Sequence, residues 1–212
     1  MNAENIDVFT QNSIRIRTDD KKIYIDPFQM KESPSDADFI LITHDHYDHF
    51  SPEDIEKVAN GKSVLVVPEK MAEKAEEVKK LVGKIVTVRA DNSYDIDGLS
   101  FETIPAYNLL KPFHSKSAGW IGYILNLDGK RIYIAGDTDA TKEAKSVKCD
   151  IALVPIGGTY TMDPKKAAEL INIIRPETAI PVHYGTIVGN PKDADKFIEY
   201  VDNSINVEIK IK

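Results

Sequence analysis

Three of the five histidines in this chain lie within six residues of one another, directly after a short apolar run. The apolar run is FILI at 39–42, and the polar segment that follows it reads THDHYDH at 43–49. A short apolar run that ends in polar residues is typical of a buried β-strand, and a loop at a strand end can aim several side chains at one point. The sequence therefore requires a fold in which a buried strand ends at a polar site.

The residue types in this segment point to metal binding. Neutral imidazole and carboxylate are the usual ligands of zinc and related divalent ions. His44 and His46 are two residues apart, so in extended backbone they point in one direction. Asp48 and His49 follow where the chain turns toward a helix that Ser51 is expected to cap. We expect these four side chains to be metal ligands.

Short apolar segments rich in β-branched residues recur along the chain and predict strands. Asp128-Gly129 separates two of them and predicts a tight hairpin. The expected strands are 14–17, 22–26, 38–43, 63–67, 84–88, 99–104, 120–127, 131–135, 150–156, 177–182 and 206–211.

Helical periodicity and capping residues predict four helices between these strands. They cover about 52–60, 69–81, 163–175 and 192–202. No low-complexity linker divides the 212 residues, so we expect a single domain over 1–212. Strand-rich halves that are each followed by helices indicate sheets sandwiched between helices, an α/β fold.

Two further polar residues follow predicted strands in the second half of the chain. Asp137 comes after 131–135, and His183 comes after 177–182. Side chains at the same edge of packed parallel strands converge in space, so both are candidate ligands. The loop from Gly157 to Met162 is either part of the site wall or a simple strand-to-helix turn.

Composition excludes several classes of protein. The formal net charge of −7 disfavours a broad nucleic-acid surface, which needs clustered Lys and Arg. Cys149 is the single cysteine, which fits a reducing compartment and excludes an internal disulfide. No apolar run approaches the roughly 18 residues needed to span a bilayer. We therefore expect a cytoplasmic enzyme that acts on a small molecule.

The segment THDHYDH resembles the signature of the metallo-β-lactamase superfamily. Other segments resemble parts of that family in the same order. The segment 23–28 resembles an early strand that ends in a supporting aspartate, here Asp26. The segments 131–139 and 180–185 resemble the strands that deliver the bridging aspartate, here Asp137, and the last histidine, here His183. The resemblance covers nearly the whole chain and implies a four-layer αββα sandwich. It points to the compact hydrolases related to ascorbate-6-phosphate lactonase and, more distantly, to the phospholipase D that acts on N-acylphosphatidylethanolamine.

The resemblance also implies a ligand set for two metal ions. His44 and His46 would hold the first ion, Asp137 would bridge, and the second would be held by Asp48, His49 and His183. The family pattern has a further histidine after the strand at 99–104, where this chain has none. Asn108, His114 or water would fill that place, and the first position is expected to be the weaker one.

The expected activity is that of a metal-dependent hydrolase. The family uses a metal-bound hydroxide, with zinc as the expected cofactor and manganese or iron as alternatives, in one or two ions. Asp48 could also orient the nucleophile or move its proton, and His114 could be a ligand, a substrate contact or a general acid. The small positive charge of a loaded site suits an anionic ester, lactone or phosphoester. The alternatives are a phosphodiesterase or nuclease, and a non-catalytic metal-binding protein.

Overall fold

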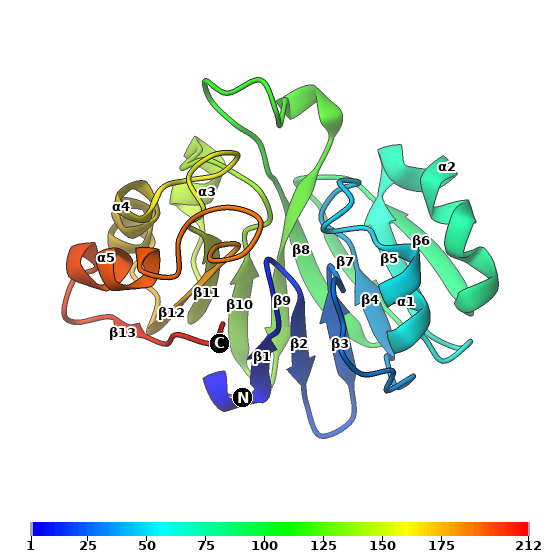
Figure 1. The fold of residues 1–212 in the computed structure, drawn as a ribbon. Helices are drawn as coiled ribbons and strands as arrows, with labels where there is room; N and C mark the ends of the chain where they lie inside the picture. Colours follow the sequence, from blue (N-terminus) through cyan, green and yellow to red (C-terminus); the bar gives the residue numbers. More distant parts are fainter. Residues whose placement is uncertain (1, 212) are drawn as a thin grey trace.

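The computed structural model describes residues 2–211 and contains two β-sheets that lie face to face between helices (Figure 1). The first sheet has six strands in chain order: β1 (Ile6–Val8), β2 (Ile14–Arg17), β3 (Lys22–Ile25), β4 (Phe39–Leu41), β5 (Val64–Pro68) and β6 (Lys84–Val88). Strands β1 to β3 pair antiparallel, whereas β3 to β6 pair parallel.

The second sheet has seven strands, and strands that are neighbours in the chain are also neighbours in this sheet. They are β7 (Ser93–Ile96), β8 (Leu99–Pro105), β9 (Ile121–Leu127), β10 (Lys130–Ile134), β11 (Ile151–Pro155), β12 (Thr178–Val182) and β13 (Asn206–Val207). Strands β7 to β10 form an antiparallel meander, and β10 to β13 pair parallel.

Helices cover the outer faces of both sheets. In Figure 1, α1 (Pro52–Val58) and α2 (Ala72–Ala75) lie on the right, and α3 (Lys142–Ser146), α4 (Pro164–Ile174) and α5 (Asp193–Tyr200) lie on the left. Four short 3₁₀ segments complete the described chain: η1 (Ala3–Asn5), η2 (Glu69–Met71), η3 (Glu76–Leu81) and η4 (Lys116–Ala118).

Three apolar clusters hold the layers together. The central cluster lies between the sheets and draws on both of them, with Leu41 and Ile134 among its members. Ile40, the neighbour of Leu41, belongs instead to the cluster under α1 and α2, while Ile171 belongs to the cluster under α4 and α5. Because each central strand is buried on both faces, its sequence is a continuous apolar run. The predicted four-layer αββα sandwich is confirmed.

Local signals were most accurate where capping or turn chemistry was specific. Ser51 caps α1 as predicted, and Asp128 and Gly129 form the hairpin between β9 and β10 with φ of 49° and 74°. The single helix predicted over 69–81 was wrong, because this segment alternates between 3₁₀ and α geometry. The last strand spans two residues and not 206–211, and β1, β7 and α3 were missed because each has only three to five residues.

The topology places the polar loops on one edge of the molecule. Strands β3 and β4 run parallel in the first sheet, and β10 and β12 point the same way in the second. The carboxyl ends of these four strands precede Asp26, His44, Asp137 and His183 respectively. Within residues 2–211, no helix has the length and apolar character that crossing a bilayer demands.

Candidate metal centre

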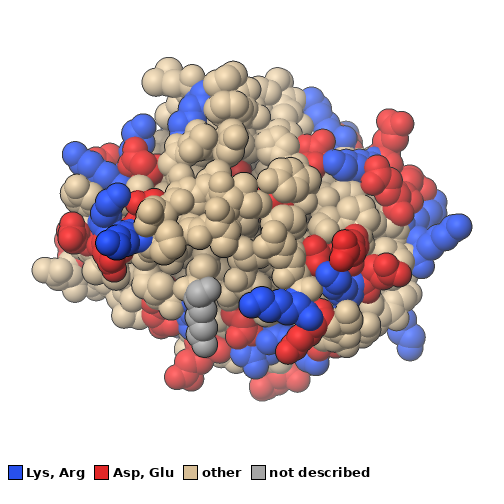
Figure 2. Space-filling model, in the orientation of Figure 1, with Lys and Arg blue, Asp and Glu red and all other residues tan. Residues whose placement is uncertain are grey.

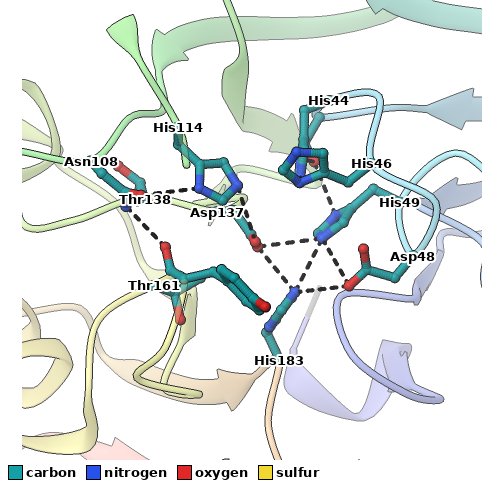
Figure 3. A network of polar contacts seen from close by, with 12 residues as sticks. His44, His46, Asp48, His49, Asn108, His114, Asp137, Thr138, Thr161 and His183 are labelled. Carbon is teal, nitrogen blue, oxygen red and sulfur yellow. Dashed lines mark hydrogen bonds and ion pairs between the residues drawn. The ribbon is translucent and has the colours of Figure 1, made fainter. Parts of the chain in front are cut away.

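Histidine and aspartate side chains from four separate loops converge at the edge of the sandwich where these strands end (Figure 3). Nearly all of them are buried, and they form overlapping groups whose candidate ligand atoms lie within 4.8 Å of one another. The converging residues are His44, His46, Asp48, His49, His114, Asp137 and His183.

The first group contains three imidazoles. His44 Nε2 lies 3.1 Å from His46 Nδ1, and the ring of His114 approaches both rings, with centroid distances of 5.2 and 5.0 Å. His114 comes from the loop between β8 and β9 and is fully buried. The structure thus brings His114, from a loop distant in sequence, to the place left open beside His44 and His46.

The second group contains two imidazoles and a carboxylate. His49 Nε2 lies 3.1 Å from His183 Nε2, and Asp48 Oδ2 lies 3.3 Å from the same atom of His183. Asp137 stands between the two groups. Its Oδ1 is 3.4 Å from His49 Nε2 and 3.3 Å from His183 Nε2, and its Oδ2 is 3.4 Å from His114 Nε2.

The donor atoms fit a divalent cation. Among the described residues, His114 Nε2 and Asp137 Oδ1 are buried polar atoms without a hydrogen-bond partner. A buried polar atom without a partner costs about 1–3 kcal/mol, and such atoms in a native fold call for an explanation. Imidazole nitrogens that face one another at 3.1 Å need a shared cation or a shared proton, and a nitrogen-rich set with carboxylates is typical of zinc.

Asn108 contacts His114 and sets its orientation. Asn108 Nδ2 donates to Tyr160 O at 3.0 Å, which turns Asn108 Oδ1 toward His114 Nδ1 at 3.1 Å. His114 Nδ1 must then carry the proton, so the lone pair of the neutral ring is on Nε2, which faces Asp137. Partners of this kind fix the tautomer of a metal-binding histidine.

Asp26 was predicted to support a ligating histidine, and the histidine that it contacts in the structure is His49. Asp26 Oδ2 accepts from His49 Nδ1 at 2.8 Å, from Thr43 Oγ1 at 2.6 Å and from Asn12 Nδ2 at 2.7 Å. Asp26 Oδ1 accepts from the Thr43 amide at 2.8 Å. The carboxylate is thereby held rigidly, and His49 Nε2 is turned toward the site.

No sequence pattern predicted two other residues of the site, Gln11 and Trp120. Gln11 Nε2 lies 3.5 Å from both Asp48 Oδ2 and His183 Nδ1, and the Gln11 carbonyl accepts from the His183 amide at 2.8 Å. The Trp120 ring packs against the three imidazoles of the first group, with distances between ring centroids of 4.8–5.1 Å. Gln11, Asp26 and His183 have φ of 45–58°, a backbone region that is uncommon for non-glycine residues.

Burial and charge set the protonation of the metal-free site. Burial lowers the pKa of His44 well below its usual value, which keeps the imidazole neutral. Burial also opposes protonation of His49, but the charges of Asp137 and Asp26 outweigh it and raise its pKa to about 9. Burial would raise the pKa of Asp48, yet the hydrogen bond with His183 and the charge of His49 lower it to about 2. The Asp48 carboxylate is therefore ionised at neutral pH.

The loop from Gly157 to Met162 forms part of the site wall. Tyr160 O accepts from Asn108, and Lys111 Nζ donates to Gly158 O at 2.9 Å and to Thr161 O. These bonds tie the His114 loop to the loop after β11. Lys116, the other lysine of the His114 loop, pairs with Glu143 at 2.7 Å, so both cations are bound to groups of the protein itself.

This chain belongs to the beta-lactamase superfamily domain family, whose model matches residues 5–183. It is 32% identical over 206 residues to a UPF0173 metal-dependent hydrolase from Pyrococcus abyssi, with 89% of this chain and 88% of that protein covered. A similar relative from Aeropyrum pernix is 33% identical over 208 residues, covering 84% and 83% of the two chains.

Solved structures show the same fold. A crystal structure from Parabacteroides distasonis, assigned as a metal-dependent hydrolase, matches with a TM-score of 0.80 and 29% identity over 98% of this chain and 93% of that one. Igni18, a metallo hydrolase from Ignicoccus hospitalis, matches with a TM-score of 0.78 and 23% identity over 97% and 94%. The resemblance to the metallo-β-lactamase superfamily is confirmed, and the chain is a metal-dependent hydrolase of that superfamily.

Proposed function

We propose that this protein hydrolyses a small ester, lactone or phosphoester at a centre of two divalent metal ions, with zinc as the expected metal. The observation that carries this proposal is the convergence of seven buried or half-buried ligand side chains, two of which present polar atoms without a partner. The family supports a hydrolase, and the donor chemistry supports zinc.

The proposed ligands divide into two sets. His44, His46 and His114 form the first, and Asp48, His49 and His183 form the second. Asp137 faces both sets and is the proposed bridge. Because His114 supplies a third imidazole, each position has three donors of its own, and the reason for expecting a weaker first position is gone. Asn108 is then a positioning residue and not a ligand.

When bound, such a metal lowers the pKa of water from about 15.7 to about 7 and stabilises negative charge on the attacked group. The protein supplies the rest. Asp26 and Asn108 hold His49 and His114 in the ligating orientation. Among the described residues, Asp48 Oδ1 has no hydrogen-bond partner, so it can orient the attacking water or accept its proton. Trp120 excludes water from one side of the first set.

The charge of the loaded site supports an anionic substrate, because the carboxylates of Asp48 and Asp137 neutralise only part of the charge of two divalent ions. A phosphodiesterase is the alternative that uses the same ligands. A cytoplasmic location and the absence of a nucleic-acid partner stay predictions from composition. So does the single domain over 1–212, which is supported by the core that both sheets share.

The test is hydrolysis by metal-depleted protein before and after zinc or manganese is restored. The substrates are p-nitrophenyl esters, lactones and bis-p-nitrophenyl phosphate. His46→Ala and Asp137→Ala are expected to abolish the metal-dependent rate while circular dichroism stays native, because the core does not depend on these side chains. Asp20→Ala, in an exposed turn, is the control and should keep full activity. Tight metal binding without turnover of any substrate class would contradict the proposal and favour a non-catalytic protein.

A further inference from the structure

Large apolar side chains gather at the loops that carry the metal ligands. Ten large apolar residues are exposed among the described residues. Five of them lie on these loops, and a sixth, Tyr160, lies on the neighbouring loop after β11. The relative exposure is 97% for Leu110, 64% for Tyr47 and 46% for Phe113. We call this set the apolar rim, and it consists of Tyr47, Leu109, Leu110, Phe113, Tyr160 and Ile187.

Two residues of the apolar rim are direct chain neighbours of the metal centre. Tyr47 lies between His46 and Asp48 in the chain, and Phe113 directly precedes His114. The rings of Phe113 and Tyr160 meet edge to face with centroids 4.8 Å apart, so the rim joins the loop after β8 to the loop after β11. Both loops are the ones that Asn108 and Lys111 tie together.

The surface around the rim carries little free positive charge. Lys74 Nζ donates to Asp45 O, Lys111 donates to two carbonyls of the loop after β11, and Lys116 pairs with Glu143. In Figure 1 the loop between β8 and β9 lies at the top of the view and the loop after β11 at the upper left. In the same orientation, Figure 2 shows that the upper and central part of the visible face is formed largely by uncharged residues, whereas Lys, Arg, Asp and Glu gather toward its flanks and lower edge. Contact with a substrate outside the metal centre is therefore mainly apolar.

We propose that the apolar rim binds an alkyl chain or aromatic ring of the substrate, attached to the ester or phosphoester group that enters the metal centre. This inference rests on the proposed function. An exposed cluster of this kind marks a binding site for an apolar group. Tyr47 and Phe113 are chain neighbours of proposed ligands. A substrate whose ester or phosphoester group is held at the metal centre therefore places its attached apolar group against them.

Binding of alkylphosphonates to the metal-loaded protein tests the inference without requiring turnover. Their anionic head binds metal, and only the chain length varies, from methyl to octyl. Complete burial of a methylene strengthens binding about fourfold, and coverage of half its surface gives about twofold. The seven added methylenes should therefore tighten binding about a hundredfold by calorimetry. In parallel, kcat/KM for p-nitrophenyl octanoate should exceed that for the acetate.

Substitutions in the rim should reduce this dependence on chain length. The double variant Leu109→Ser with Leu110→Ser, and separately Phe113→Ser, should lower the octyl-to-methyl affinity ratio at least about tenfold. The matched control is Ile173→Ser, since Ile173 is 49% exposed on α4, in the outer helix layer, and should keep the full ratio.

Each result decides between the two proposals. Chain-length-dependent phosphonate binding without hydrolysis of any ester would support the rim and count against the proposed function. Hydrolysis with equal affinity for methyl and octyl phosphonate would overturn the rim and leave the function intact. If the double serine variant changes the sedimentation coefficient but keeps the full length dependence, the rim joins copies of this chain, which also overturns the proposal.

Discussion

Asn108→Leu is expected to weaken metal binding although Asn108 is not one of the proposed ligands. The substitution keeps the side-chain volume similar but removes the contacts of Asn108 with His114 at 3.1 Å and with Tyr160 O at 3.0 Å. Each hydrogen bond is worth about 1 kcal/mol net, so metal-free protein should lose about 2 kcal/mol of unfolding free energy. Loss of a partner that orients a ligand costs about 10- to 100-fold in metal affinity.

Calorimetric titration of metal-free protein with zinc measures this effect directly. One of two binding events should weaken by that factor, while the other is nearly unchanged. Asn172→Leu is the control, because Asn172 also joins two segments through backbone groups, at 2.9 and 2.8 Å, but lies on α4 far from the ligands in the fold. Asn108→His should weaken binding too, since a larger ring displaces the oxygen that orients His114. Tighter binding by Asn108→His, or unchanged binding by Asn108→Leu, would refute the reasoning.

Three further predictions follow from single residues. The pKa of His49 is raised to about 9 without metal, so its charged form stabilises the metal-free fold at neutral pH, and this stability is lost as pH rises through 9. Zinc binding at pH 7 should release the proton of His49. Calorimetric titrations in buffers of different ionisation enthalpy would measure this release. Burial raises the pKa of Cys149 to about 12, so its reaction with a disulfide reagent at pH 8 should be at least about a hundredfold slower in native than in denatured protein. Gly157→Ala places a methyl group 2.4 Å from His183 O and 2.6 Å from Val188 Cγ2. This overpacking should lower the unfolding free energy measured by urea denaturation by about 1–3 kcal/mol. An unchanged denaturation midpoint would show that the loop after β12 shifts to accept the methyl group without loss of stability.

The sequence alone predicted the buried strands, the two site residues that follow strands in the second half of the chain, and the metal-binding segment, because each depends on a local pattern of residue types. Continuous apolar runs predicted the buried strands because the sandwich covers both faces of each sheet. Asp137 and His183 were predicted because they follow such strands, and parallel strands bring their carboxyl ends to one edge. The cluster at 43–49 predicted metal binding because its residue types and spacing have few structural explanations, and the fold and family that it indicated are confirmed.

Only the tertiary structure shows which of the candidate side chains lies beside His44 and His46, and it is His114. Asn108 and His114 were both open candidates, because the path of a loop depends on distant anchors that leave no local pattern. Here these anchors are the hydrogen bond from Asn108 to Tyr160 O and the bonds from Lys111 to the loop after β11, across about 50 residues of chain. Gln11 was invisible for the same reason, since it reaches His183 across 172 residues and only the packed sheets bring the two together.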